Sequence, residues 1–294
     1  MASSANGKAA AGAHVRRHAR ASLEENVDSF MEANRARWDE LVAVHAASAF
    51  CDVASFRAGR STLKSIELAE LGDVKGCTLL HLQCHFGMDT LSWARRGGRV
   101  TGVDFSERAI TRARALAEEQ RLSARFIQSN VYDLPAVLDD QFDIVFTSYG
   151  VLCWLPDLTR WAAVIAHFLK PGGTFYIVDG HPFAGMLSAD ADPNVLTVTP
   201  FYFPRAEPDG YEADGSYAAA TPNLKNRLSY EWPHSLSEIV CALIVAGLEI
   251  EFLHEFPVCA WARFPALMEQ GDDGWWRMKD ARAIPLIFSV RAHK

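Results

Sequence analysis

The fold is decided by residues 77–87, which read Cys77-Thr-Leu-Leu-His-Leu-Gln-Cys-His-Phe-Gly87. A short apolar run here ends in a turn with one glycine, and an amphipathic stretch from Asp89 to Arg96 follows. Strand, turn and helix in this order form the first part of a βαβ unit. The pattern therefore predicts a strand over 77–82 and a helix directly behind the turn at 83–87.

Outward from this unit, the chain keeps alternating strands with helices. Such alternation implies right-handed crossovers and a parallel sheet covered on both faces. The prediction is an α/β fold with a Rossmann-like, doubly wound, mostly parallel seven-stranded sheet. The other strands are expected at 99–103, 124–128, 142–147, 174–178, 248–257 and 285–291, and the other helices at 107–120, 161–169 and 235–246, with stops at Lys170-Pro-Gly-Gly173 and Gly247.

The segments around this core have their own composition. Residues 1–22 are rich in Ala, Ser and Gly and contain no acid, which predicts a disordered tail. Residues 23–73 are expected to form a helical lid, because apolar side chains recur at helical spacing between Phe30 and His45. Residues 181–233 are rich in proline and aromatic residues and read as an insertion with short strands, and residues 234–294 supply the last helix and strands.

Composition excludes several classes of function. The formal net charge of −7 argues against a protein that binds nucleic acid by neutralising phosphates. The six cysteines have no C-x-x-C spacing, so no metal is expected. No apolar run is long enough to cross a bilayer and no signal sequence is visible, which favours a cytoplasmic protein without a membrane partner. The oligomeric state stays open, with a homodimer as one option.

The turns behind the strands are the expected binding site, because ligands of open parallel sheets bind beyond the carboxyl ends of the strands. Asp104 ends the second strand, where its carboxylate could accept hydrogen bonds from both ribose hydroxyls of a nucleoside. Its alternative role is the N-cap of the helix that begins at Glu107. The turn at 83–87 lacks the G-x-G-x-x-G pattern of a dinucleotide site.

Five motifs in order give the chain a family resemblance. They are Leu79-Leu-His-Leu-Gln-Cys-His-Phe-Gly87, Val100-Thr-Gly-Val-Asp104, Asn130-Val-Tyr-Asp-Leu-Pro135, Phe142-Asp-Ile-Val-Phe146 and Leu169-Lys-Pro-Gly-Gly173. Over residues 74–178 the sequence resembles the class I S-adenosylmethionine-dependent methyltransferases. The resemblance implies S-adenosylmethionine as cofactor, a cofactor-binding core over 74–180 and a single methyltransferase domain over 23–294.

The resemblance also implies roles for individual residues. Asn130 and Val131 would lie at the adenine edge, Phe105 near the adenine face and Ser148 beside the methionine part. Trp38 resembles part of a lid, although core packing is as plausible. The family usually has an acid at His81 and glycines at Gln83 and His85. The cofactor contacts expected are thus Trp38, Gln83, His85, Gly87, Asp104, Phe105, Asn130, Val131 and Ser148.

Methyl transfer is an in-line displacement, so the protein mainly has to align acceptor, methyl carbon and sulfur. An acceptor that must lose a proton also needs a base. His181 is the first candidate, because a neutral imidazole accepts a proton near pH 7; a histidine bonded to a loop carbonyl is the alternative. The other candidates are Asp179, Glu231 and His234, with Tyr149 in the turn beside the reactive sulfur.

The aromatic side chains of the insertion could wall a pocket for a small-molecule acceptor, or form only a small core of their own. They are Phe201, Tyr202, Phe203, Tyr211, Tyr217, Tyr230 and Trp232. The function expected is methylation of oxygen, nitrogen or carbon in a small molecule, such as a specialised metabolite. The alternatives are a catalytically silent S-adenosylmethionine-binding sensor or scaffold, and a nicotinamide-dependent oxidoreductase, which the glycine-poor turn disfavours.

Overall fold

The computed structural model describes residues 7–189, 191–198, 202–205, 207–213, 215–218, 223–280 and 282–294, with side chains from residue 26 onward. Its centre is a seven-stranded sheet in the order β10-β13-β5-β4-β1-β2-β3, in which only β13 runs antiparallel to its neighbours. The strands are β1 (Thr78–Leu82), β2 (Arg99–Asp104), β3 (Ala124–Gln128), β4 (Phe142–Ser148), β5 (Leu169–Gly180), β10 (Glu249–Phe256) and β13 (Ile287–His293). The seven predicted strands are confirmed.

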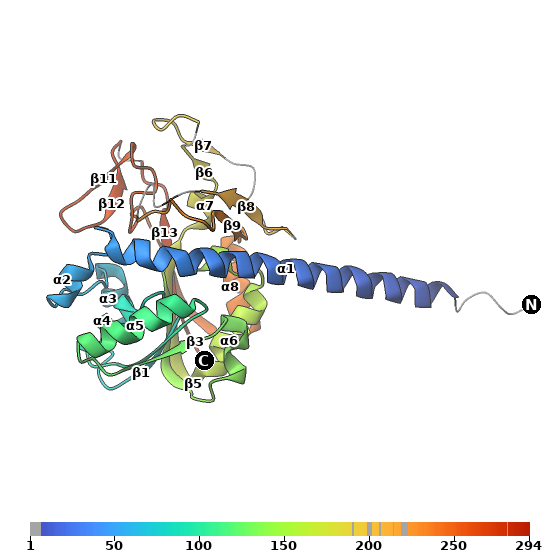
Figure 1. Cartoon of the computed structure of the whole chain (residues 1–294), viewed down its shortest axis with the longest axis horizontal. Coiled ribbons are helices and arrows are strands. Elements are labelled where there is room, and N and C mark those ends of the chain that lie inside the picture. Colours follow the sequence, from blue (N-terminus) through green and yellow to red (C-terminus); the bar gives the residue numbers. More distant parts are fainter. Residues whose placement is uncertain are drawn as a thin grey trace, which may run out of the picture.

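Helices cover both faces of this sheet (Figure 1). Leu80 and Leu82 of β1 pack in a core with α6 and α8, whereas Leu79 packs on the opposite face with Trp93 of α4. Because side chains alternate across a strand, a strand that is buried on both faces must be apolar at nearly every position. The helices are α1 (Gly7–Ala47), α2 (Val53–Arg57), α3 (Ser65–Leu71), α4 (Met88–Arg95), α5 (Glu107–Glu119), η1 (Val131–Ala136), η2 (Leu152–Trp154), α6 (Leu158–Phe168), α7 (Pro182–Gly185) and α8 (Leu236–Val245).

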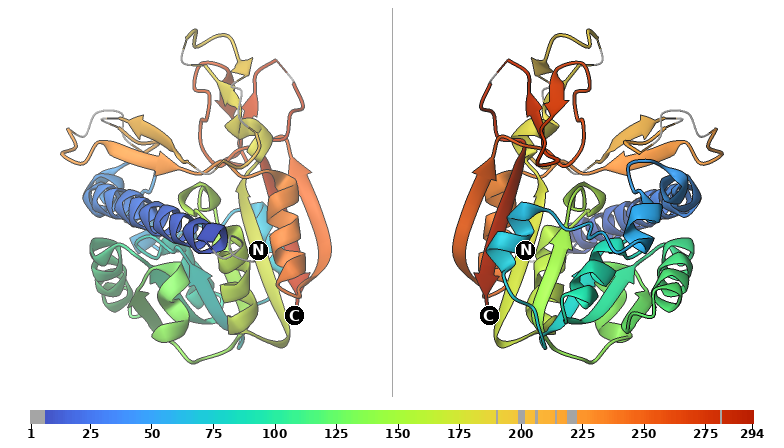
Figure 2. Two further views of the ribbon diagram at one scale, coloured as in Figure 1. Left: turned by 90° about the vertical axis from the view of Figure 1, so that its right-hand side faces the viewer. Right: turned by 90° about the vertical axis from the view of Figure 1, so that its left-hand side faces the viewer.

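Short hairpins lie together at one end of the molecule, on the side where the carboxyl ends of the parallel strands open (Figures 1 and 2). They pair β6 (Leu187–Ser188) with β7 (Thr197–Val198), β8 (Asp209–Glu212) with β9 (Leu228–Glu231), and β11 (Met268–Gln270) with β12 (Trp276–Met278). The first two pairs fall in the predicted insertion. The third was not predicted, because strands of three residues leave no readable alternation.

The amino-terminal end differs from the expectation. Residues 7–22 belong to α1, where the sequence predicted a disordered tail, and residues 1–6 lie outside the described residues. The first part of α1 projects beyond the body of the molecule, while its second part crosses it (Figure 1). The predicted division of the chain at residues 23, 74, 181 and 234 stays a prediction.

The second part of α1 ties the hairpin β8–β9 to the body. Asn34 pairs with the backbone of Tyr230 through two hydrogen bonds of 2.8 Å each. Arg37, which is buried, donates to the carbonyl oxygens of Ala213, Gly215, Asn226 and Arg227 at 2.7–3.2 Å. These carbonyl groups would otherwise lack partners away from water.

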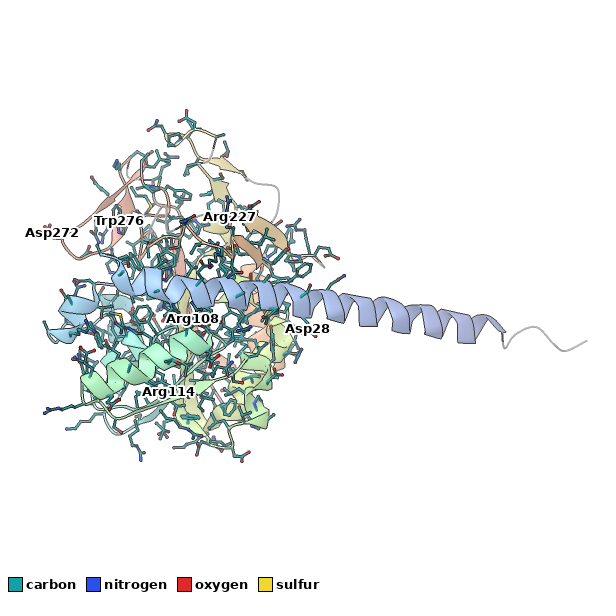
Figure 3. The ribbon with its side chains drawn as sticks, in the orientation of Figure 1. Asp28, Arg108, Arg114, Arg227, Asp272 and Trp276 are labelled. Carbon is teal, nitrogen blue, oxygen red and sulfur yellow. The ribbon has the colours of Figure 1, made fainter. Side chains whose placement is uncertain are left out.

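The opposite side of α1 is bonded to the start of α5. Asp39 accepts a hydrogen bond of 2.6 Å from the Ser106 hydroxyl, and Ser106 is the N-cap of α5. Figure 3 shows Arg108 of α5 and Arg227 next to β9 on the two sides of α1. The helix therefore joins the sheet layer to the hairpin layer.

Replacing Arg37 is expected to destabilise this junction. Arg37→Met removes the four hydrogen bonds and leaves carbonyl groups unpaired, so the free energy of unfolding should fall by about 3 kcal/mol. Urea unfolding measures it. The control is Arg125→Met, whose exposed ion pair with Asp140 should contribute less than about 0.5 kcal/mol. Equal losses in the two variants would contradict this account of α1.

Candidate functional site

A cavity of about 1900 Å³ opens at the carboxyl ends of β1, β2, β4 and β5. The strand order reverses between β1 and β4, and the loops behind these two strands part there. Side chains from α1, from the hairpin β8–β9 and from β12 line the opposite wall. All cofactor contacts expected from the sequence line this cavity, namely Trp38, Gln83, His85, Gly87, Asp104, Phe105, Asn130, Val131 and Ser148.

The turn behind β1 has an unusual backbone. Gln83, His85 and Gly87 have positive φ angles of 55°, 51° and 78°. A side chain at such φ costs roughly 1 kcal/mol relative to glycine, and a Cβ at Gly87 would lie 2.7 Å from the Phe126 ring. Only position 87 therefore requires glycine for lack of space.

Contacts hold the two strained residues. The Gln83 side chain donates to the Val151 carbonyl oxygen at 3.0 Å. The His85 ring packs against Trp38 and His45 of α1, with ring centroids 5.5 and 5.1 Å apart. Within the described part of the chain, Gln83 Oε1 and His85 Nε2 are buried without a hydrogen-bond partner. Two orphaned polar atoms in the lining of the cavity are suited to a polar ligand.

Asp104 is the buried carboxylate of the site. Its oxygens accept hydrogen bonds from the backbone N–H groups of His85 (2.8 Å) and Ser106 (2.9 Å). Burial raises the pKa of Asp104 to about 6, although the two hydrogen bonds oppose the shift. The N-cap of α5 is Ser106, so the alternative role of Asp104 as N-cap is wrong. Each carboxylate oxygen can accept a second bond, which leaves capacity for two ribose hydroxyls.

The predicted adenine side is arranged around η1. The Asn130 side chain accepts a hydrogen bond of 3.1 Å from the Tyr132 N–H and so caps η1. This is the ordinary turn role that the sequence left open. Val131 is the first residue of η1, and the first N–H groups of a helix have no intrahelical partner. Its amide is thus the better candidate to bond a base.

His81 stands at the position where an acid was expected. It is buried, and its Nδ1 lies 2.8 Å from the Thr90 hydroxyl. Burial lowers the pKa of His81 to about 3, so the ring is neutral at neutral pH. A neutral ring cannot replace the negative charge of an acid.

The loop behind β4 is fixed by two acids. The buried Asp179 accepts hydrogen bonds from the N–H groups of Gly150, Val151, Leu152 and Gly180, and burial raises its pKa. Tyr149 has a positive φ of 47°, and its hydroxyl donates to Glu67 Oε2 at 2.7 Å. Asp179 and the Tyr149 hydroxyl are therefore engaged in holding the loop.

The two candidate histidines line the cavity, and every nitrogen of their rings lies close to a protein oxygen or nitrogen atom. His181 Nδ1 accepts from the Phe183 N–H at 3.0 Å; Nε2 lies 2.7 Å from Glu255 Oε1, close but off the hydrogen-bond direction. His234 Nε2 lies 2.7 Å from the Leu155 carbonyl oxygen and Nδ1 lies 3.0 Å from Glu238 Oε2. This geometry favours the structural role for His181 and gives His234 the same role.

Glu231, the remaining candidate base, comes from β9 and lines the cavity. Among the described residues, no hydrogen bond or ion pair engages its carboxylate. Burial raises the pKa of Glu231, Asp209 adds to the rise, and Arg263 and Arg37 oppose it. Of the four candidates, Glu231 alone presents a free acceptor to the cavity in the described part of the chain.

The aromatic wall is only partly the one predicted. Tyr202, Tyr211, Tyr217 and Trp232 line the cavity. Phe203 is exposed, the Tyr230 ring packs on Phe30, and Phe201 lies outside the described residues. Sequence reasoning missed Trp154, Trp261 and Trp276, which also line the cavity. They come from the short helix η2, a loop and the hairpin strand β12, whose sequences carry no pattern that points to a pocket.

Comparisons with known proteins agree with this geometry. Residues 80–177 match the family described as "Methyltransferase domain". The chain is 32% identical over 106 residues to the ubiquinone biosynthesis O-methyltransferase of Aeromonas salmonicida, which covers 36% of this chain and 44% of that protein. It is 34% identical over 120 residues to the demethylmenaquinone methyltransferase of Lactococcus lactis, covering 39% and 47%. The matched part is thus under half of these relatives' length.

Solved structures share the fold. An S-adenosylmethionine-dependent methyltransferase from Mesorhizobium loti superposes with a TM-score of 0.56 at 20% identity, covering 77% of this chain and 94% of that one. A protein from Listeria monocytogenes described as a putative member of the same class gives 0.53 at 18% identity, covering 78% and 95%. At this identity the likeness concerns the fold. Among the described residues, no helix has the length and apolar character needed to span a membrane.

The neutral His81 predicts a pH dependence of stability. The unfolded chain binds a proton at His81 near pH 6.5, whereas the folded protein does so only near pH 3. The unfolded state therefore binds more protons in this window, and stability falls as the pH drops below 6.5, by up to about 1.4 kcal/mol per pH unit from this group.

His81→Asn should remove the contribution of His81 to the pH dependence of the free energy of unfolding. The amide oxygen keeps an acceptor near Thr90 but does not titrate. Urea unfolding of both proteins between pH 7 and 4.5 gives the difference between their free energies of unfolding. Asp104 and Glu67 titrate in both proteins, so their contributions cancel in this difference. The stability gap between wild type and variant should narrow as the pH falls. A constant gap would show that His81 is not held neutral.

Proposed function

Since residues 80–177 form a class I S-adenosylmethionine-dependent methyltransferase domain, we propose that this protein transfers the methyl group of S-adenosylmethionine to a small-molecule acceptor. The observation that carries the proposal is the free accepting capacity of Asp104 beside the left-handed turn 83–87, at the edge where the strand order reverses. Glycine is forced there only at position 87, which suits a ligand without a pyrophosphate.

The residues of this chain bind and orient the cofactor. Asp104 accepts hydrogen bonds from the ribose hydroxyls, the Val131 N–H donates a hydrogen bond to the adenine edge, and Phe105 packs on the base. Gln83 Oε1 and His85 Nε2, orphaned among the described residues, gain a polar neighbour. When bound, the cofactor supplies a methyl group on a positively charged sulfur. Trp38 and His45 of α1 close over the turn and exclude water.

The acceptor is proposed to be a small ring compound that carries an O–H or N–H group. The aromatic wall supports an apolar, planar ligand. Glu231 lies in the same cavity as a carboxylate with a raised pKa, which suits a general base. The relative from Aeromonas is named for ubiquinone biosynthesis and the one from Lactococcus for demethylmenaquinone, which supports phenols and hydroquinones as the first compounds to test.

Binding tests the cofactor assignment. Calorimetric titration is expected to show binding of S-adenosylmethionine and S-adenosylhomocysteine but not of NAD. Asp104→Ala should weaken both by about 2 kcal/mol or more, since charge-assisted hydrogen bonds are lost. Binding of NAD instead, or unchanged affinity in Asp104→Ala, would refute the assignment. Binding without turnover on any phenol or amine would favour the silent sensor.

Cofactor affinity should also depend on pH. The pKa of Asp104 is raised to about 6, and only the ionised carboxylate accepts freely from both hydroxyls. Affinity is therefore expected to be constant above pH 7 and to fall as the pH drops through 6. Calorimetry with S-adenosylhomocysteine between pH 5 and 8 measures it, and Asp104→Ala should remove the pH-dependent part.

Turnover tests Glu231. Glu231→Gln keeps the shape of the side chain but cannot take a proton, so turnover on a hydroxyl acceptor should fall about 100-fold or more while the affinity for S-adenosylhomocysteine stays unchanged. In the wild type, the rate should rise with pH as Glu231 ionises, and the variant should lack this rise. The matched control is Glu238→Gln, a carboxylate bonded to His234 outside the cavity lining. Equal rates in wild type and Glu231→Gln would exclude Glu231 as the base.

A further inference from the structure

The charge that the amino-acid end of the cofactor requires is absent from its expected place. S-adenosylmethionine ends in an ammonium and a carboxylate group, and each needs an opposite charge or several hydrogen bonds when it leaves water. His81, which stands where the family usually has an acid, is buried and neutral. A buried neutral ring offers the ammonium no countercharge, so another residue must supply it.

Asp89 is a carboxylate without an ion-pair partner among the described residues. It lies in the first turn of α4, just behind the turn 83–87, and lines the cavity partly buried. Its Oδ1 accepts from the Thr62 hydroxyl at 2.5 Å and its Oδ2 more weakly from the Ser148 hydroxyl at 3.4 Å. Within the described part of the chain it belongs to no ion pair, and burial raises its pKa. Two hydroxyl groups do not neutralise the charge, so a cation in the cavity would be stabilised here.

Lys64 is a cation in the lining of the same cavity. It is the N-cap residue of α3, and its Nζ lies 5.1 Å from the centroid of the Trp275 ring. Lys64 is near enough to Asp89 for its positive charge to oppose the rise of the Asp89 pKa. Among the described residues, Lys64 makes no ion pair. The pair thus presents one negative and one positive group, separated by more than a salt-bridge distance.

We propose that Asp89 accepts hydrogen bonds from the ammonium group of the cofactor and that Lys64 binds its carboxylate, so that the acid missing at His81 is replaced from the start of α4. This inference rests on the proposed function. Ser148, bonded to Asp89, belongs to the loop expected beside the methionine part. The nearby Glu67 is excluded, because it is buried outside the cavity lining and holds the Tyr149 hydroxyl and the Lys64 N–H.

Truncated ligands test the pair in the full-length protein. S-adenosylhomocysteine has both charged groups, S-adenosyl-3-thiopropylamine lacks the carboxylate, and 5′-methylthioadenosine lacks both. Calorimetry at pH 8 should show that Asp89→Asn weakens binding of the first two about 10- to 100-fold, because a charge-assisted contact is lost. Lys64→Met should weaken only the first. Binding of 5′-methylthioadenosine should change less than about twofold in both variants, which also shows that they fold.

The control is Glu70→Gln, which removes a carboxylate of α3 that is bonded to Tyr176 and His254 outside the cavity lining and should leave the ratio of the three affinities unchanged. Equal weakening of all three ligands in Asp89→Asn would overturn the proposal and give Asp89 a structural role. A ratio that changes as much in Glu70→Gln as in Asp89→Asn would overturn it as well. If the wild type binds 5′-methylthioadenosine as tightly as S-adenosylhomocysteine, this inference fails while the proposed function stands. If the wild type binds none of the three ligands, both fail.

Discussion

The cavity exists because α1 is bonded on both sides. The carboxyl ends of parallel strands form an open edge, and on its own this edge would be a shallow crevice. Arg37 and Asn34 bind the backbone of β8–β9 over this edge, and Asp39 binds the cap of α5 beneath it. The hairpin has few buried apolar side chains of its own, so its place depends on these polar contacts, and with it the position of Glu231 on β9.

Much of the fold could be predicted, because each strand of the sheet has a local sequence signal and only the pairing of the strands joins residues that are far apart in the chain. Each of its strands is a local apolar run, and residues such as Ser235, which caps α8 by accepting from the Glu238 N–H, mark helix starts within four positions. The hairpins could not be predicted equally well. Their strands have two to four residues, and the hairpin β8–β9 is held by Arg37, about 180 positions away in the sequence. The helix over 7–22 was missed because the composition there favours no buried face.

The candidate site divides in the same way. The cofactor side follows from strand ends, and the structure brings all nine predicted contacts to one cavity. The residues of the acceptor side were predicted from their amino-acid type alone. The type does not reveal which lone pairs are already occupied by hydrogen bonds within the protein. His181 and His234 have side chains typical of a base, but their ring nitrogens are engaged with protein groups. Glu231 is less typical of a base, yet no donor among the described residues occupies its carboxylate. Only the hydrogen-bond pattern separates these candidates.

The turn behind β1 shows why departures from a motif need not abolish a site. Glycines are common in such turns because left-handed φ angles and close approach both favour them, yet here the two requirements separate. Position 87 lacks space for a Cβ, while positions 83 and 85 only require the angle, whose cost of roughly 1 kcal/mol the contacts of Gln83 and His85 can offset. The His85 ring packs on α1, and α1 in turn binds the hairpin β8–β9, so this turn is linked to the acceptor side of the cavity. Substitutions that look like losses in the sequence therefore couple the two halves of the cavity.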